Sequence, residues 1–208
     1  GNDPLKAYGK TTDLTAMGGA QYVHTFDKCF FMPSDLTAGL EYNRDRLKDN
    51  MWGYNRHTDQ TVNIYSAFLQ NEWKNDRWGI LIGGRLDKHN MVDNVIFSPR
   101  ANLRFNPTQN INLRLSYSSG FRAPQAFDED MHIENVGGTV AMIERAKDLK
   151  EEKSQSFSAS ADMYHRFGAF QTNLLIEGFY TRLTDVFVLG EPYDRGDGIL
   201  VKTRSNGP

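Results

Sequence analysis

The chain has 208 residues, of which 39% are hydrophobic and 24% are charged, and its formal net charge is −2. Its mean hydropathy of −0.59 is polar for a chain of this length, so a conventional soluble core is not the obvious arrangement. The small net charge leaves no large basic surface for phosphates, which argues against a nucleic-acid partner. The single cysteine, Cys29, excludes an internal disulfide and any zinc site with several cysteines.

The sequence contains no uninterrupted apolar stretch near the roughly 18 residues that a transmembrane helix needs. A membrane β-barrel remains compatible with it, because barrel strands need only about 10 residues of alternating polarity. Such alternation recurs along the chain and predicts about eight strands, with a ninth beginning near Ile199. In chain order, the predicted strands cover residues 14–26, 36–43, 61–73, 77–87, 95–105, 111–117, 156–166 and 170–180.

The clearest alternation lies in residues 95–105 and 111–117, with Leu103 and Leu113 on the apolar faces. Successive side chains of a strand point to opposite sides, so the intervening polar residues share the other face. The link 106–109 has the composition of a turn, which predicts an antiparallel hairpin. We expect antiparallel neighbours throughout the chain, in a simple meander with little helix.

The connections between the predicted strands alternate between short and long. In chain order they are short near Asp27, long at 45–60, short at 74–76, medium at 88–94, short at 106–109, very long at 121–153, short around Gly168 and long at 183–198. Nothing in the architecture of a soluble β-sandwich makes short and long connections alternate. An outer-membrane barrel does alternate them, because its periplasmic turns are short and its extracellular loops are long.

Aromatic residues gather near the ends of the predicted strands, which suits the two interfaces of a membrane. They are Tyr22, Phe26, Tyr42, Trp73, Trp78, Phe105, Tyr117 and Tyr180.

A series of motifs in fixed order resembles the barrel of TonB-dependent outer-membrane receptors. Residues 98–117 are followed by Gly-Phe-Arg-Ala-Pro at 120–124 and, after the long loop, by Asp-Leu-Lys-Glu-Glu-Lys-Ser at 148–154. Two earlier segments, 68–73 and 83–87, resemble further strands of the family in the expected order. The family usually has proline where this chain has Glu151. The match spans about residues 61–180 and is specific as a series.

The resemblance implies an all-β fold, in which an antiparallel meander of eight to nine strands is a fragment of a 22-stranded transmembrane barrel. Residues 1–208 are then a partial β-barrel domain without the plug domain, the TonB-binding segment and the first and last strands. Residues 121–153 are expected to form a long extracellular loop. The implied location is the cell outer membrane of a Gram-negative bacterium.

The resemblance also implies a receptor that takes up a scarce substrate, of the iron-siderophore, haem or cobalamin class, with energy supplied through TonB. The implied partners are the TonB energy-transducing complex, a small-molecule substrate such as a metal chelate, and membrane lipid. Two alternatives from other classes are a passive outer-membrane porin and a soluble β-barrel or β-sandwich binding module. The ordered motifs disfavour the porin.

Catalytic, cofactor and metal chemistry is not expected of this chain. Its histidines lack the spacing of a zinc site; they are His24, His57, His89, His132 and His165. Ser158 or Ser160, Asp162 and His165 are the residue types of a catalytic triad, but residues this close on one strand cannot converge. Residues 128–130 are acidic but lack the spaced ligands and the glycine of a calcium loop.

Two groups of residues are candidates for substrate binding. Five arginines are expected to project from polar strand faces into the lumen, where a guanidinium can bind carboxylate or phosphate. They are Arg85, Arg100, Arg104, Arg114 and Arg122. The alternative is that they contact the plug or neighbouring acidic side chains. The second group is the aromatic and basic loop at 51–57, with Trp52, Tyr54, Arg56 and His57, which could equally be a plain extracellular loop.

The chain on its own in water must cover its apolar strand faces, because exposed apolar surface costs about 25 cal/mol per Å². We expect either self-association or closure with the apolar side inward. The second route buries Ile80, Leu103 and Leu113 and exposes Arg100, Arg104 and Arg114.

Shortening the loop at 121–153 in the intact receptor is expected to weaken substrate capture and to leave barrel assembly intact, because long loops tolerate change and carry recognition. Whole-cell binding of the substrate measures this. Unchanged binding after the deletion would count against the expectation.

Overall fold

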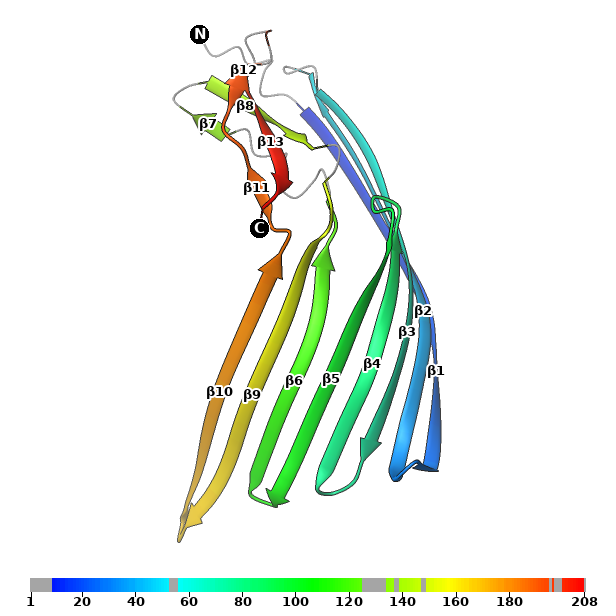
Figure 1. Cartoon of the computed structure of the whole chain (residues 1–208), viewed down its shortest axis with the longest axis vertical. Helices are drawn as coiled ribbons and strands as arrows, with labels where there is room; N and C mark the ends of the chain where they lie inside the picture. Colours follow the sequence, from blue (N-terminus) through cyan, green and yellow to red (C-terminus); the bar gives the residue numbers. More distant parts are fainter. Residues whose placement is uncertain are drawn as a thin grey trace.

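The computed structural model describes residues 9–52, 56–124, 134–136, 139–146, 149–194, 196 and 200–207. Eight long strands form one sheet in the order β1-β2-β3-β4-β5-β6-β9-β10, and every neighbouring pair is antiparallel. Their bounds are β1 Gly9–Cys29, β2 Met32–Met51, β3 Arg56–Lys74, β4 Trp78–His89, β5 Val95–Thr108, β6 Ile111–Arg122, β9 Glu152–Phe167 and β10 Phe170–Thr184. The sheet is a tall curved wall (Figure 1), which confirms the predicted meander.

Five short strands form a second sheet beyond the ends of β6, β9 and β10 (Figure 1). They are β7 Glu134–Val136, β8 Thr139–Arg145, β11 Phe187–Leu189, β12 Tyr193–Asp194 and β13 Leu200–Asn206. The strand expected near Ile199 is β13, but it belongs to this second sheet.

The expectation of antiparallel pairing throughout is wrong at one place, because β13 pairs with β8 in parallel. These two strands come from different long connections, so no tight turn dictates their relative direction. Among the described residues, no helix is long and apolar enough to cross a membrane.

The two ends of the main sheet carry different connections. At one end the strands are joined by residues 30–31, 75–77, 109–110 and 168–169, and the left-handed conformation these tight turns need appears at Phe30 (φ 63°) and Gly168 (φ 57°). At the other end lie the longer connections, including the one between β6 and β9. The predicted alternation of short and long connections is therefore confirmed except at the link between β2 and β3.

One predicted long connection is much shorter than expected. Residues 45–60 were expected to be a loop, but β2 continues to Met51 and β3 starts at Arg56. Residues 44–50 are polar on both faces of the strand except for Leu47. The segment therefore lacks the alternation of apolar and polar residues from which strands were predicted. Backbone pairing needs no apolar face where water covers both sides of the strand.

The registers divide the side chains of the main sheet into two faces. One row, Trp73–Ile80–Leu103–Leu115, belongs to what we call the outer face, and the alternating residues form the inner face. Most exposed large apolar side chains lie on the outer face, among them Leu40, Ile82, Phe97 and Ile176. Buried side chains such as Leu47, Ser66, Asp87 and Ile96 lie on the inner face. Because side chains crowd on the concave side of a curved sheet, the inner face is the concave one.

The expected closure with the apolar side inward is therefore wrong. Leu113 is 37% exposed on the outer face, and Leu103 and Ile80 are only half-buried, whereas the expectation had all three buried. Arg100 and Arg114 are exposed, as expected, and Arg104 is half-buried. Short turns fix the strand registers, and the stagger of the strands sets how tightly a sheet can curl. In this sheet the strand registers produce an open wall (Figure 1). The edge strands β1 and β10 each have one unpaired edge within the described sheet.

Aromatic pairs border the apolar part of the outer face at both ends. We call Tyr42, Tyr65, Tyr117 and Phe157 the upper aromatic row, with ring centroids 4.9 Å apart in Tyr42–Tyr65 and 4.8 Å apart in Tyr117–Phe157. The lower aromatic row comprises the stacked pairs Phe31–Trp73 and Trp78–Phe105. On β3 the two rows are separated by the residues between Tyr65 and Trp73, which extend about 26 Å along the strand. At the usual tilt of barrel strands, this length corresponds to about 20 Å along the membrane normal. This separation approaches the apolar band of a membrane barrel, about 25 Å tall.

The 208-residue chain made separately in water is expected to self-associate, because its outer face is apolar and its edge strands are unpaired. Light scattering during size-exclusion chromatography should show large species that detergent converts to a smaller one. A monodisperse monomer without detergent would contradict the exposure of the outer face.

Candidate functional site on the inner face

Four side chains on three adjacent strands form a polar network at the centre of the inner face. Glu41, Ser66 and Asp87 are successive cross-strand neighbours on β2, β3 and β4. The Arg85 guanidinium reaches all three: Nη1 lies 2.6 Å from Glu41 Oε2, Nε donates to Asp87 Oδ1 at 2.8 Å and Nη2 donates to Ser66 Oγ at 2.8 Å. The Ser66 hydroxyl in turn donates to Asp87 Oδ1 at 2.5 Å.

The network occupies the guanidinium of Arg85 with its own neighbours. Asp87 is buried, with its side chain 4% exposed, so its charge depends on Arg85 for compensation. Arg85 thus ties three strands together and is not free to bind an anion. The sequence left open whether Arg85 binds substrate or contacts neighbouring acidic side chains. The structure shows the contact with acidic side chains.

A groove of about 480 Å³ lies beside the network. Its lining includes Arg85, Arg100, Ser98 and Ser118. Arg100 is exposed, and within the part of the chain that the structure describes it forms no ion pair. Arg100 is therefore the inner-face cation best placed to meet an anionic group from outside this wall.

Aromatic packing over a glycine shapes the wall of this groove. The Phe68 ring lies directly over Gly39 of the neighbouring strand, where an added Cβ would come within 2.3 Å of Phe68 Cζ. Glycine is required at this position because the ring occupies the space of a side chain.

The three remaining arginines have separate roles. Arg104 Nη2 donates to the backbone carbonyls of Asn75 at 3.0 Å and Trp78 at 3.4 Å, which anchors it to a short turn. Arg114 Nε donates to Asn112 Oδ1 at 2.7 Å. The guanidinium of Arg122 lies 5.7 Å from the Phe187 ring centroid and so contacts the second sheet. The five arginines share the inner side as predicted, but they do not form one cluster.

The structure does not bring the candidate residues of 51–57 together with the arginines. Trp52 is 47% exposed at the end of the β2–β3 pair. Tyr54 lies outside the described residues, and for Arg56, the first residue of β3, the structure describes the backbone alone. His57 lies on the outer face, with Nδ1 2.9 Å from Asn50 Oδ1. Any role of this group in gripping substrate stays a prediction.

A fully buried histidine lies near the upper end of the inner face. His89 is 0% exposed, and its Nδ1 accepts a hydrogen bond from the Met91 N–H at 3.0 Å, which requires this nitrogen to be unprotonated. It is therefore a neutral packing residue. In the described residues no group of three or more histidine, cysteine, aspartate or glutamate side chains could hold a metal ion. Ser158 and Asp162 face inward whereas His165 faces outward, so this set does not converge.

Sequence reasoning missed Glu41, Ser66 and Asp87 as partners of Arg85. Each lies on the polar side of a strand, which the alternation indicates. Which polar residues meet across strands depends on the register, and the register depends on turn lengths that the sequence defines only to within a few residues.

Comparison with known proteins identifies this wall. The family model "TonB dependent receptor-like, beta-barrel" matches residues 2–205. The siderophore receptor PirA from Pseudomonas aeruginosa has a TM-score of 0.76 at 15% identity, with 97% of this chain and 38% of that chain covered. The ferric enterobactin receptor PfeA from Pseudomonas aeruginosa has a TM-score of 0.73 at 20% identity, with 99% and 33% covered. The copper transporter OprC has a TM-score of 0.62 at 14% identity, with 95% and 33% covered.

These structural matches establish the fold alone, because all three sequence identities are too low to carry over a function. The chain spans less than two fifths of the length of each of these structures. A search of curated proteins found no significant match to the sequence.

Replacing Asp87→Asn in the intact protein is expected to lower the free energy of unfolding by about 1–2 kcal/mol, because it weakens a hydrogen-bonded and partly buried ion pair. Arg114→Gln, which loses only the contact with Asn112, should cost less than about 0.5 kcal/mol. Denaturant unfolding of the refolded receptor in detergent gives both values. Equal losses for the two variants would show that the network does not stabilise the wall.

Proposed function

The chain belongs to the TonB-dependent receptor β-barrel family, and on that premise we propose that the intact protein is an active importer energised through TonB. Members of this family are outer-membrane receptors of Gram-negative bacteria and not enzymes, so this chain is a piece of an outer-membrane barrel wall. Its matched residues, 2–205, cover the whole described sheet.

The whole receptor in this proposal has parts beyond this wall. The described sheet is open, with free edges at β1 and β10, and this supports a proposal in which further strands complete a barrel and a plug domain fills it. The segment that contacts TonB lies with the plug. The connection predicted at 121–153 spans residues 123–151 between β6 and β9; it lies at the end opposite the short turns, and in this proposal it is the long extracellular loop.

The proposed substrate is a small metal chelate of the iron-siderophore class. Its support is the inner-face groove, where Arg100 offers an unpaired guanidinium beside the hydroxyl groups of Ser98 and Ser118. A guanidinium suits anionic oxygen groups, which many metal chelates carry. One of the similar structures is named a siderophore receptor, another a ferric enterobactin receptor and a third a copper transporter, so copper is a competing cargo. Haem and cobalamin remain alternatives from the family resemblance.

A passive porin is the second candidate for the whole protein. It would share the alternation and the loop asymmetry but would leave a water-filled lumen. Arg100 would then influence ion selectivity and not uptake, which separates the two proposals experimentally.

Uptake of radioactive iron as ferric siderophore should depend on TonB. Cells that express the intact receptor are expected to accumulate the chelate, and cells that lack TonB but express the same amount of receptor should not. Equal accumulation with and without TonB would favour the porin, and no accumulation of any ferric siderophore would remove the substrate class but leave the import mechanism open to haem or cobalamin.

Arg100→Gln is expected to raise the half-saturating concentration of an anionic chelate about five- to tenfold, because one charge-assisted contact is lost. Arg104→Gln is the matched control, since its guanidinium binds backbone carbonyls of a turn. Uptake kinetics in whole cells, at equal receptor levels, provide the comparison. If the two variants behave alike, Arg100 does not contact substrate.

A further inference from the structure

The second sheet joins two connections that are far apart in the sequence. β7 and β8 belong to the connection between β6 and β9, whereas β11, β12 and β13 follow β10. β8 and β13 pair in parallel, from Ala141 with Leu200 to Arg145 with Arg204. The Ala146 N–H continues this contact by donating to the Arg204 carbonyl at 2.9 Å. One backbone ladder therefore spans both connections (Figure 1).

A single side chain closes the ladder at the end nearer the main sheet. Asn206 Oδ1 accepts a hydrogen bond from the Lys150 N–H at 2.8 Å, and Asn206 Nδ2 donates to the Lys150 carbonyl at 3.1 Å. The same Nδ2 donates to the Asp185 carbonyl at 2.6 Å. Lys150 lies two residues before β9, and Asp185 directly follows β10. We call Lys150, Asp185 and Asn206 the clasp, because they join the base of one connection to the base of the other.

The chain around the clasp is held to the main sheet by further contacts. Phe187, the first residue of β11, donates its N–H to Glu152 Oε2 of β9 at 3.1 Å. The Arg122 guanidinium of β6 lies 5.7 Å from the centroid of the Phe187 ring. Asp185 turns the chain out of β10 with a φ of 55°, a conformation that aspartate adopts more readily than most residues. The clasp therefore sits on a base formed by β6, β9 and β10.

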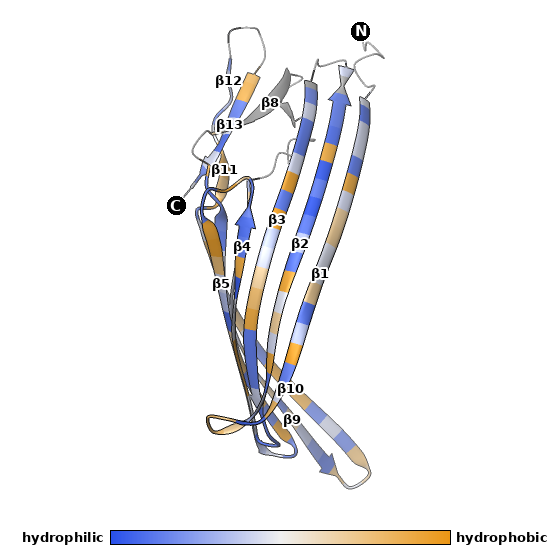
Figure 2. Ribbon diagram, turned by 90° about the vertical axis from the view of Figure 1, so that its right-hand side faces the viewer, coloured by the Kyte–Doolittle hydropathy of each residue, from blue (hydrophilic) through white to orange (hydrophobic). Residues whose placement is uncertain are grey.

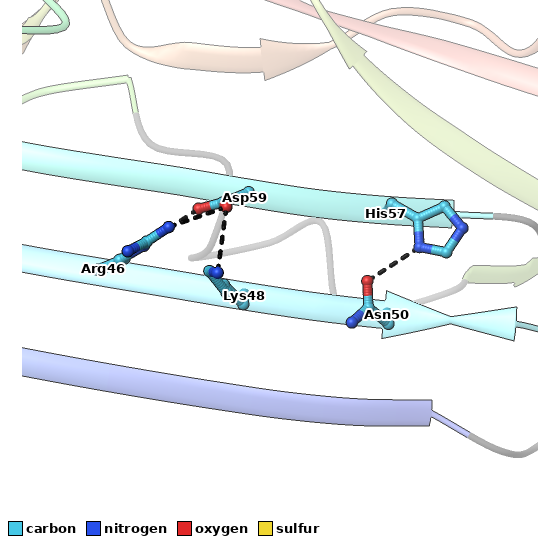
Figure 3. A network of polar contacts seen from close by, with 5 residues as sticks. All are labelled: Arg46, Lys48, Asn50, His57 and Asp59. Carbon is cyan, nitrogen blue, oxygen red and sulfur yellow. Dashed lines mark hydrogen bonds and ion pairs between the residues drawn. The ribbon is translucent and has the colours of Figure 1, made fainter.

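The hairpin of β2 and β3 shows how another connection at this end is tied. Its upper part is held by ion pairs from Arg46 Nη2 and Lys48 Nζ to Asp59 Oδ2, at 3.2 and 3.6 Å. Asn50 Oδ1 lies 2.9 Å from His57 Nδ1. Figure 3 shows that all five side chains belong to β2 and β3 themselves. These contacts stabilise one hairpin, whereas the clasp joins two connections.

Asn90, in the connection between β4 and β5, makes the same kind of reciprocal bond as Asn206. Its Oδ1 accepts a hydrogen bond from the Asn63 N–H at 2.9 Å, and its Nδ2 donates to the Thr61 carbonyl at 2.8 Å. Both partners lie on β3, which pairs directly with β4. Asn90 is therefore a matched control for Asn206, because it has the same chemistry but does not join two connections.

The clasp lies outside the apolar band. Asp185 is five residues beyond Tyr180, the register partner of Phe157 in the upper aromatic row. Five residues advance about 17 Å along a strand, or about 13 Å along the membrane normal at the usual tilt. Figure 2 shows a similar change of polarity on β2, whose upper part is hydrophilic apart from one residue. The second sheet therefore stands in water on the side of the long connections, which in outer-membrane barrels is extracellular.

We propose that the second sheet is one preassembled unit of substrate capture, and that Asn206 is the positioning residue that holds it together. A ligand that contacts both connections then meets them already in place, so its binding does not have to order them. Without the clasp, the competent arrangement is only partly populated, and the apparent affinity falls by that fraction. The ligand in this proposal rests on the import function proposed above, whereas the union of the two connections does not.

Hydrogen exchange of the intact receptor in detergent tests the union directly. Asn206→Asp keeps the size of the side chain and the acceptor for the Lys150 N–H, but it loses both donated bonds and places a charge against two carbonyls. Amides in 139–146 and 200–206 should together exchange at least about tenfold faster, because two hydrogen bonds are lost. Asn90→Asp should leave both segments unchanged. Faster exchange in 200–206 alone would show that the two connections are independent and that the proposal is wrong.

Substrate capture provides a second readout. At equal receptor levels, Asn206→Asp should raise the half-saturating concentration of the imported ferric chelate about five- to tenfold. The maximal uptake rate should not change, because the barrel wall and its energy supply are untouched. An equal effect of Asn90→Asp, or a lower maximal rate at the same half-saturating concentration, would contradict a positioning role. If the unaltered receptor imports no ferric chelate, the proposed function fails and the exchange measurement alone decides on the clasp.

A reversible staple separates the role of the clasp from folding. In a receptor with Cys29→Ser, the changes Lys150→Cys and Asn206→Cys place two thiols where the reciprocal bonds lay. The oxidised form should show the exchange protection and the half-saturating concentration of the unaltered receptor. Reduction of the same folded protein should reproduce Asn206→Asp. Identical behaviour of the oxidised and reduced forms would overturn the proposal.

Discussion

The structure depends on a single constraint: in hydrocarbon, every backbone N–H and C=O must find its partner within the sheet. Long antiparallel ladders meet that constraint, and once the registers are fixed each residue belongs to one of two faces. The face that meets lipid must be apolar, whereas the face that meets the lumen can carry charge. The apolar row that contains Leu103 lies on the outer face, and the polar network around Arg85 lies on the inner face of the same sheet.

The two faces also carry different side chains. Inside, Arg85 holds β2, β3 and β4 together through Glu41, Ser66 and Asp87, whereas Arg100 forms no ion pair with any residue that the structure describes. Outside, the lysines and arginines that the described strand registers place on this face lie at the end that carries the long connections, where they adjoin the aromatic row and not the apolar band. The two sides of one sheet are therefore chemically distinct, apolar with basic residues near the long connections outside and polar inside.

The sequence predicted the strands of the apolar band well because a period of two between apolar and polar residues is a strong signal, as in Ile111 to Tyr117. It failed for residues 44–50, because there the alternation is between basic and acidic residues and lacks an apolar face. It could not predict the parallel pairing of β8 with β13, which brings together two distant connections. The five candidate arginines looked equivalent in sequence, and only the register separated Arg85, which is paired with Glu41 and Asp87, from Arg100, which forms no ion pair within the residues that the structure describes.

The central claim is that one face of this wall meets lipid and the other meets the lumen. The most direct measurement is the accessibility of nitroxide labels attached to cysteines introduced at Leu113 and Arg114, adjacent residues on opposite faces, in the intact receptor reconstituted in lipid with Cys29 replaced. We expect the label at Leu113 to collide with dissolved oxygen and to be shielded from a water-soluble nickel chelate, and the label at Arg114 to show more nickel and less oxygen contact. The reverse order, or equal accessibility at the two positions, would contradict the assignment of the faces.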